Sequence, residues 1–122
     1  MHKITAIGEI LYDIYPEKKR LGGAPFNFIY HIWKITGNAN FISSVGDDEN
    51  GKEILGFLNS AGFNTNYISI DEEHPTGTVH VKLRSDKSPQ FIISNEKYIH
   101  YSFVHDIGIK LCKFSDENDV YN

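Results

Sequence analysis

Two adjacent glycines, Gly22 and Gly23, stand directly before a segment that favours a helix and has Pro25 at its start. Glycine lets the backbone turn tightly and approach a ligand where any Cβ would clash. Proline suits the first helical position, because its φ angle is already helical and its missing N–H had no partner there. The turn therefore gathers free N–H groups at one point, with Asn27 in the first helical turn beside them. Such a point can hold the oxygens of a ligand.

A carboxylate, Asp13, lies in a second short segment with strand character, residues 10–15, after a first one over residues 3–9. We expect the first strand to be central in a sheet and the charged residues 17–20, after Pro16, to form a turn. Asp13 would then follow the carboxyl end of a strand, where open α/β sheets bind their ligands. The pattern alone fits an exposed polar residue on an edge strand equally well, so both interpretations stay open.

The elements that must position these groups follow in order. Apolar residues from Phe26 to Ile35 fall on two helical faces, which predicts a helix that is mostly buried. Residues 38–45 predict a second, parallel strand, so strand, helix and strand form a right-handed βαβ unit. A further helix ends at Gly62, and residues 67–70 predict a third strand.

Residues 46–53 match the spacing of a phosphate-binding P-loop except at the last position, where Glu53 replaces the required Ser or Thr. Three carboxylates in this loop would also repel a triphosphate. Asn50 and Glu53 fit better as the N-cap and capping box of the helix that follows.

From Thr76 the pattern changes to strict alternation. Val79, Val81 and Leu83 share one side, which is typical of an antiparallel strand with one face in water. Residues 85–89 predict a turn and residues 90–94 a returning strand. Farther on, we expect a strand at 98–101, a helix within 104–114 and the start of a strand at 119–122.

Composition limits the alternatives. The chain has 122 residues, the size of one ordinary domain, and its net charge of −4 argues against nucleic acid or a membrane as a partner. The single cysteine, Cys112, cannot form an internal disulfide, and no signal peptide or membrane span is evident, so we expect a cytoplasmic protein. Six histidines without paired spacing, and no Cys-x-x-Cys, predict no metal site.

Three ordered segments resemble the PfkB-type, ribokinase-like carbohydrate kinases, most closely the fructokinase-like branch. The first segment is residues 8–16 (Gly-Glu-Ile-Leu-Tyr-Asp-Ile-Tyr-Pro). The second is the family's first signature, which consists of residues 22–27 (Gly-Gly-Ala-Pro-Phe-Asn), Gly37, residues 45–48 (Val-Gly-Asp-Asp) and Gly51. The third is residues 75–79 (Pro-Thr-Gly-Thr-Val). The resemblance implies an α/β, ribokinase-like fold: a truncated parallel sheet flanked by helices, with a small β lid from strands near 10–21 and 76–95. Residues 1–122 would be the N-terminal part of such a kinase domain, with the C-terminal ATP-binding half absent.

The same resemblance implies the sugar-binding half of an ATP-dependent carbohydrate kinase that phosphorylates a sugar hydroxyl. The residues implied to hold the sugar hydroxyls or to lie over the sugar are Asp13, Gly22, Gly23, Asn27, Val79 and Val81. The catalytic Asp is expected beyond residue 122. ATP and Mg²⁺ would serve the full-length enzyme, and we expect this fragment to bind neither and to show no kinase turnover.

Other functions stay open. The chain could be a non-catalytic sugar-binding or remnant protein of the same fold whose lid sheet pairs two subunits as a homodimer, or part of a nucleoside kinase. A dinucleotide-binding oxidoreductase fits less well, because no Gly-x-Gly-x-x-Gly follows the first strand.

Overall fold

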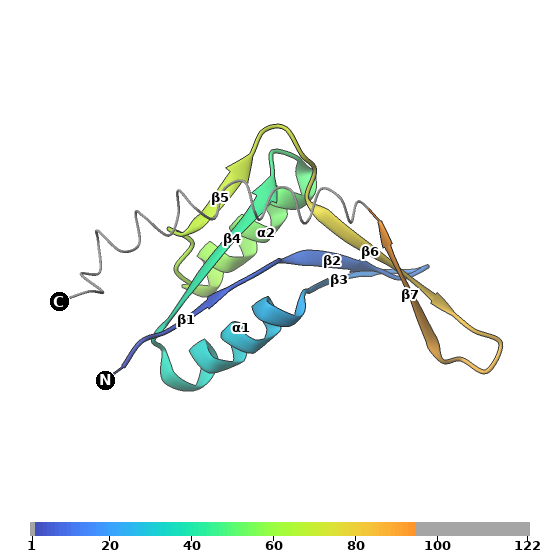
Figure 1. Cartoon of the computed structure of the whole chain (residues 1–122), viewed down its shortest axis with the longest axis horizontal. Coiled ribbons are helices and arrows are strands. Elements are labelled where there is room, and N and C mark those ends of the chain that lie inside the picture. Colours follow the sequence, from blue (N-terminus) through green and yellow to red (C-terminus); the bar gives the residue numbers. More distant parts are fainter. Residues whose placement is uncertain (1, 95–122) are drawn as a thin grey trace.

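The computed structural model describes residues 2–94. The strands and helices predicted between residues 98 and 122 lie outside the described residues. Nine elements follow one another along the described chain (Figure 1). They are β1 (Ile4–Ile7), β2 (Leu11–Ile14), β3 (Lys19–Gly22), α1 (Ala24–Thr36), β4 (Ala39–Gly46), α2 (Glu49–Ala61), β5 (Ile68–Asp71), β6 (Gly77–Leu83) and β7 (Pro89–Ser94).

The first sheet has three strands in the order β1-β4-β5, and both of its pairings are parallel. The predicted parallel strands and the helices between them are therefore present. The prediction that the first strand is central is wrong for the described residues, because β4 lies in the middle and β1 at an edge. The composition of β4 explains its position: seven of its eight residues are buried, whereas Ile4 and Ile7 at the ends of β1 are exposed.

The core lies between this sheet and the two helices. Phe26 and Ile29 of α1 pack with Phe41 of β4 and with Ile54 and Leu58 of α2. The prediction that the first helix is mostly buried is wrong: only Phe26 and Ile29 are buried, while Phe28 is 56% and Ile35 82% exposed. One face of α1 packs on the sheet, and Phe28 and Ile35 on its other side are not covered by any of the described residues.

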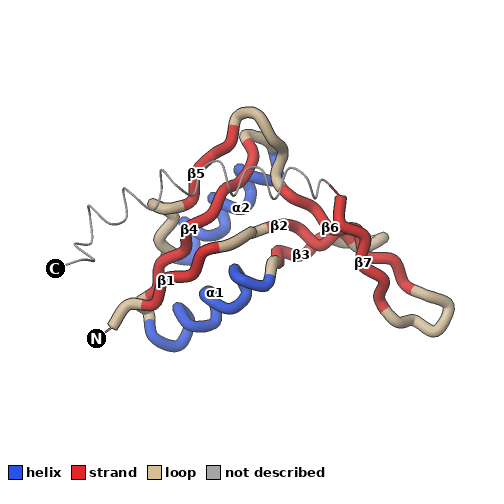
Figure 2. Tube along the Cα trace, in the orientation of Figure 1, coloured by secondary structure: helices blue, strands red, loops and turns tan. Residues whose placement is uncertain are grey.

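The second sheet has four strands in the order β3-β2-β6-β7 and extends away from the helices (Figure 2). The predicted hairpin is present, because β6 and β7 pair antiparallel. The lid expected from strands near 10–21 and 76–95 is present too, because β6 also pairs with β2, and this pairing is parallel. One correction concerns residues 17–20: the turn lies at 15–18, where the Tyr15 N–H donates to the Lys18 carbonyl, and Lys19–Gly22 form β3 antiparallel to β2.

Candidate functional site

The register of the four-stranded sheet places Asp13, Arg20, Val79 and Val81 on one face. Asp13 of β2 pairs with Arg20 of β3 on one side and with Val79 of β6 on the other. Side chains of directly paired residues lie on the same face of a sheet, about 5 Å apart at their Cβ atoms. Val81 lies two residues farther along β6, on the same face because side chains alternate, and is almost completely buried.

The Asp13 carboxylate packs against the backbone of the first glycine. A Cβ added to Gly22 would lie 2.5 Å from Asp13 Oδ2, a distance that real Cβ atoms do not adopt. Gly23 has a φ of 104°, which side chains rarely adopt, and a Cβ there would lie 2.6 Å from the carbonyl oxygen of Glu9. Gly23 therefore requires glycine for the turn into α1, whereas a side chain at Gly22 would displace the Asp13 carboxylate from its present position.

Asn27 lies in the first turn of α1. Its backbone N–H donates to the Gly23 carbonyl over 2.8 Å, and its side chain is exposed. Gly23 is the N-cap and has no side chain to cap the helix, so the helix N-terminus beside the Asp13–Gly22 contact is open. The structure thus gathers Asp13, both glycines and the first turn of α1 at the junction of β3 with α1.

The pKa of Asp13 is shifted by its surroundings at this junction. Burial raises the pKa of the Asp13 carboxyl above its ordinary value of 3.8, and the positive charge of Arg20 opposes this rise in part. Arg20 was not among the predicted site residues, because we assigned its segment to a turn. No alternation marks the segment Lys19–Gly22 as a strand, so the sequence pattern gave no signal for it.

The N-terminus of α2, in contrast, is closed. Asp48 Oδ1 accepts hydrogen bonds from the Gly51 N–H at 2.8 Å and the Thr76 hydroxyl at 2.7 Å, and Asp48 Oδ2 accepts from the Thr76 N–H at 2.8 Å. Thr76 Oγ1 in turn accepts from the Gly46 N–H at 2.9 Å. We call this set, Gly46, Asp48, Gly51 and Thr76, the Asp48–Thr76 clamp. Burial alone would raise the pKa of Asp48, but the hydrogen bonds from Thr76 and Gly51 outweigh it and lower that pKa.

The clamp corrects one prediction and supports another. The N-cap of α2 is Asp48, not Asn50, because the helix begins at Glu49 and the Asp48 side chain reaches the Gly51 N–H. The absence of a P-loop is explained by the same contact, since a carboxylate already occupies the helix N-terminus that would face a phosphate. The clamp also links two of the sequence motifs, residues 45–48 and 75–79, and gives both a structural role.

Glu53, predicted as part of a capping box, makes a different contact. Its carboxylate accepts from the Tyr12 hydroxyl at 3.1 Å and pairs with Lys19 Nζ at 2.6 Å. Lys19 also donates to Asn50 Oδ1 at 2.9 Å, so α2 is tied to β2 and β3 of the second sheet. Burial, and then the hydrogen bond and charge of Glu53, raise the pKa of Tyr12 to about 12.

Within residues 2–94, no group of three or more His, Cys, Asp and Glu side chains could hold a metal ion, so these residues do not fit a Mg²⁺ site. The helices of the same part of the chain are too short or too polar to cross a membrane.

Comparisons with known proteins fit this geometry. The model of the pfkB family carbohydrate kinases matches residues 1–120. The Escherichia coli fructokinase is 35% identical over 94 residues, a match that covers 73% of this chain and 31% of that enzyme. The chain therefore spans about a third of the length of the curated relatives it matches.

Among solved structures, fructokinase from Vibrio cholerae O395 in its apo form superposes with a TM-score of 0.72 and 25% identity, over 81% of this chain and 36% of that one. An uncharacterized sugar kinase from Pyrococcus horikoshii, solved in complex with ATP, gives a TM-score of 0.67 and 30% identity, over 76% and 34%. The predicted ribokinase-like α/β fold is confirmed by these neighbours. On its motifs, its fold and the match over residues 1–120, the chain belongs to the pfkB family of carbohydrate kinases.

Proposed function

We propose that this chain forms the sugar-binding part of an ATP-dependent, fructokinase-like carbohydrate kinase that phosphorylates a sugar hydroxyl. The observation that carries the proposal is the contact of the Asp13 carboxylate with the backbone of Gly22, directly beside the uncapped N-terminus of α1. Acceptor oxygens and free N–H groups at one point complement a hydroxyl, which both donates and accepts hydrogen bonds.

In this proposal, Asp13 accepts hydrogen bonds from two sugar hydroxyls, and the backbone of Gly22 and Gly23 approaches the ring closely because neither residue has a side chain. The Asn27 amide supplies a further donor and acceptor from the first turn of α1. Val79 and Val81 lie on the same face of the sheet as Asp13 and are buried, so that they would form part of the apolar wall behind the bound hydroxyls. The second sheet, from strands near 10–21 and 76–95, would then act as the lid.

We assign ATP, Mg²⁺ and the catalytic Asp to a C-terminal half of the full-length enzyme, beyond residue 122. The described residues contain no fitting metal ligands, so no chemical step is placed in them. The 122-residue chain should accordingly bind sugar but not transfer phosphate. We further propose that the enzyme is cytoplasmic. We also propose that the lid sheet pairs two subunits as a homodimer. Analytical ultracentrifugation of the chain would then show a dimer, and disrupting the exposed strand β3 would convert it to a monomer.

The test is titration calorimetry of the chain with D-fructose in the absence of ATP. We expect measurable binding that Asp13→Asn reduces at least tenfold, because the amide replaces one of two acceptor oxygens with a donor. Asp47→Asn is the matched control, since the Asp47 side chain is exposed and lies outside the site. Equal loss in both variants, or no binding by the unmodified chain, would refute the proposal. Adenosine in a parallel titration distinguishes a nucleoside kinase.

A further inference from the structure

Glu53 lies on α2, yet its carboxylate contacts two side chains of the second sheet. We propose that Glu53 is a positioning residue for the candidate sugar site: it holds the second sheet at the orientation in which Asp13 lies beside the open N-terminus of α1. The inference rests on the proposed sugar binding and extends it, because Glu53 acts on the site through the sheet and does not itself touch the sugar.

The contact joins one turn of α2 to two strands at once. Glu53 Oε2 accepts a hydrogen bond from the Tyr12 hydroxyl at 3.1 Å and pairs with Lys19 Nζ at 2.6 Å. Lys19 Nζ also donates to Asn50 Oδ1 at 2.9 Å and lies 4.6 Å from the centre of the Tyr12 ring. The helix therefore holds a side chain from β2 and a side chain from β3 that also contact each other.

Tyr12 distinguishes this contact from an ordinary surface ion pair. The side chains of Lys19 and Glu53 are 38% and 46% exposed, and such a pair alone contributes little because water and salt screen it. Tyr12, in contrast, is only 8% exposed and belongs to the hydrophobic core. Burial, and then the hydrogen bond and charge of Glu53, raise the pKa of Tyr12 to about 12, so the hydroxyl remains a donor throughout the neutral range.

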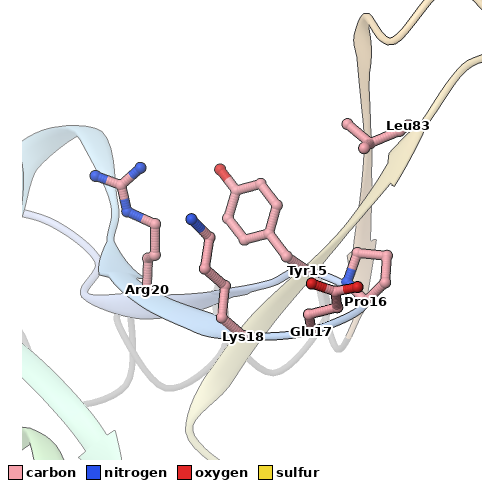
Figure 3. Close-up of a pocket in the computed structure, with 6 residues that line it drawn as sticks. All are labelled: Tyr15, Pro16, Glu17, Lys18, Arg20 and Leu83. Carbon is pink, nitrogen blue, oxygen red and sulfur yellow. The ribbon is translucent and has the colours of Figure 1, made fainter.

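The register connects this contact to the candidate sugar site. Tyr12 and Asp13 are neighbours in β2, so their side chains lie on opposite faces of the sheet. Lys19 lies on the Tyr12 face, and Arg20 lies on the Asp13 face. Figure 3 shows Arg20 and Tyr15 projecting together from this second face. The helix α2 therefore holds one face of the sheet, while the opposite face presents Asp13.

Two separate attachments to α2 fix the angle of the second sheet. The Asp48–Thr76 clamp holds the chain directly before β6, and the Glu53 contact holds β2 and β3. A single attachment would leave the sheet able to rotate about it, whereas two attachments at different strands define one orientation. Loss of the Glu53 contact should therefore move Asp13 relative to α1 without removing any group from the sugar site.

The first test is titration calorimetry of the 122-residue chain with D-fructose in about 0.01 M and about 1 M salt, which shortens the Debye length from about 30 Å to about 3 Å. Fructose is uncharged, so salt acts on its binding through the Lys19–Glu53 pair. We expect high salt to weaken binding about threefold in the unmodified chain. Glu53→Gln should show the weaker affinity in both buffers. Glu49→Gln removes the same charge from an exposed position of α2 and should leave affinity and salt dependence unchanged.

The second test needs no sugar. Residual dipolar couplings of the backbone amides report the orientation of the second sheet relative to the first. In the unmodified chain and in Glu49→Gln, the couplings of both sheets should fit one common alignment. In Glu53→Ala, the couplings of β2, β3 and β6 should depart from the alignment that fits β1, β4 and β5. Glu53 lies at the surface, so its replacement leaves the hydrophobic core intact.

The two tests separate this inference from the proposed function. An unchanged orientation in Glu53→Ala, or fructose binding that is as tight and as salt-dependent in Glu53→Gln as in the unmodified chain, would overturn the inference and leave the proposed function standing. If the sheet reorients in Glu53→Ala but the unmodified chain binds no fructose, the proposed function fails, and the role of Glu53 in a sugar site fails with it.

Discussion

The Asp48–Thr76 clamp should contribute a large share of the stability of this chain, and Asp48→Ala tests this directly. The substitution removes the N-cap of α2, which costs about 1 kcal/mol in comparable proteins. It also leaves the N–H of Thr76, a residue only 3% exposed, without its acceptor. A buried unsatisfied donor costs about 1–3 kcal/mol. We therefore expect Asp48→Ala to lower the free energy of unfolding by about 2–4 kcal/mol.

The assay is urea unfolding followed by the fluorescence of Trp33, the single tryptophan. Asp47→Ala is the neighbouring control, and as an exposed substitution it should stay within about 0.5 kcal/mol. Thr76→Val removes the hydroxyl at nearly constant volume and leaves the Gly46 N–H without an acceptor. Because Asp48 and Thr76 share two hydrogen bonds, the double variant should be less destabilised than the sum of the single ones, by at least 0.5 kcal/mol.

Two results would refute this reasoning. The first is a loss below about 0.5 kcal/mol for Asp48→Ala, which would mean that water replaces the lost contacts without cost. The second is strict additivity in the double variant, which would mean that Asp48 and Thr76 stabilise the chain independently. The lowered pKa of Asp48 adds a pH dependence: the stabilisation is complete above the unfolded value near 3.8 and is lost as the pH falls through the lower folded value.

Three further predictions concern the site and its surroundings. Asp13→Asn should raise the urea midpoint at pH 7, because burial raises the pKa of Asp13 and the ionised form is disfavoured in the folded chain; the gain should vanish below pH 4, where the carboxyl is protonated. The raised pKa of Tyr12 stabilises the chain fully below pH 10, and this contribution should be lost as the pH rises toward 12 in the unmodified chain but not in Tyr12→Phe. Gly23→Ala should cost about 1–3 kcal/mol in urea unfolding, because its φ is 104°, whereas Gly56→Ala, in open space within α2, should stabilise by about 0.5 kcal/mol.

Much of the fold could be predicted from periodicity, because the elements of the first sheet bury apolar residues in regular patterns. β4 has a nearly continuous buried run, and α2 carries Ile54 and Leu58 on one face and ends at Gly62 in the left-handed conformation. β3 could not be found in this way. Three of its four residues are at least partly exposed, and two of them are charged, so no apolar alternation marks the strand.

The features that sequence patterns missed depend on contacts between distant residues. Asp48 and Asn50 are both good N-cap residues, and the structure shows that Asp48 is the one that accepts from the Gly51 N–H and also from Thr76, 28 residues away. Glu53 has the spacing of a capping box, yet Tyr12 and Lys19 engage it from the second sheet. The family resemblance placed the strand around Asp13 in one lid with the hairpin, but the parallel direction of the β2–β6 pairing, which brings Val79 beside Asp13, has no local signal.

The N-termini of α1 and α2 differ in whether a side chain of the chain itself caps them. Both follow strands of neighbouring sheets, and both could attract oxygens through their free N–H groups. At α2, Asp48 supplies those oxygens from within the chain and joins the helix to Thr76. At α1, glycine takes the N-cap position and no side chain caps the helix, while Asp13 stands beside it with a raised pKa. A capped helix would be more stable at this second site. In the proposed function, the hydroxyls of the sugar would accept from the free N–H groups of α1 and donate to the Asp13 carboxylate.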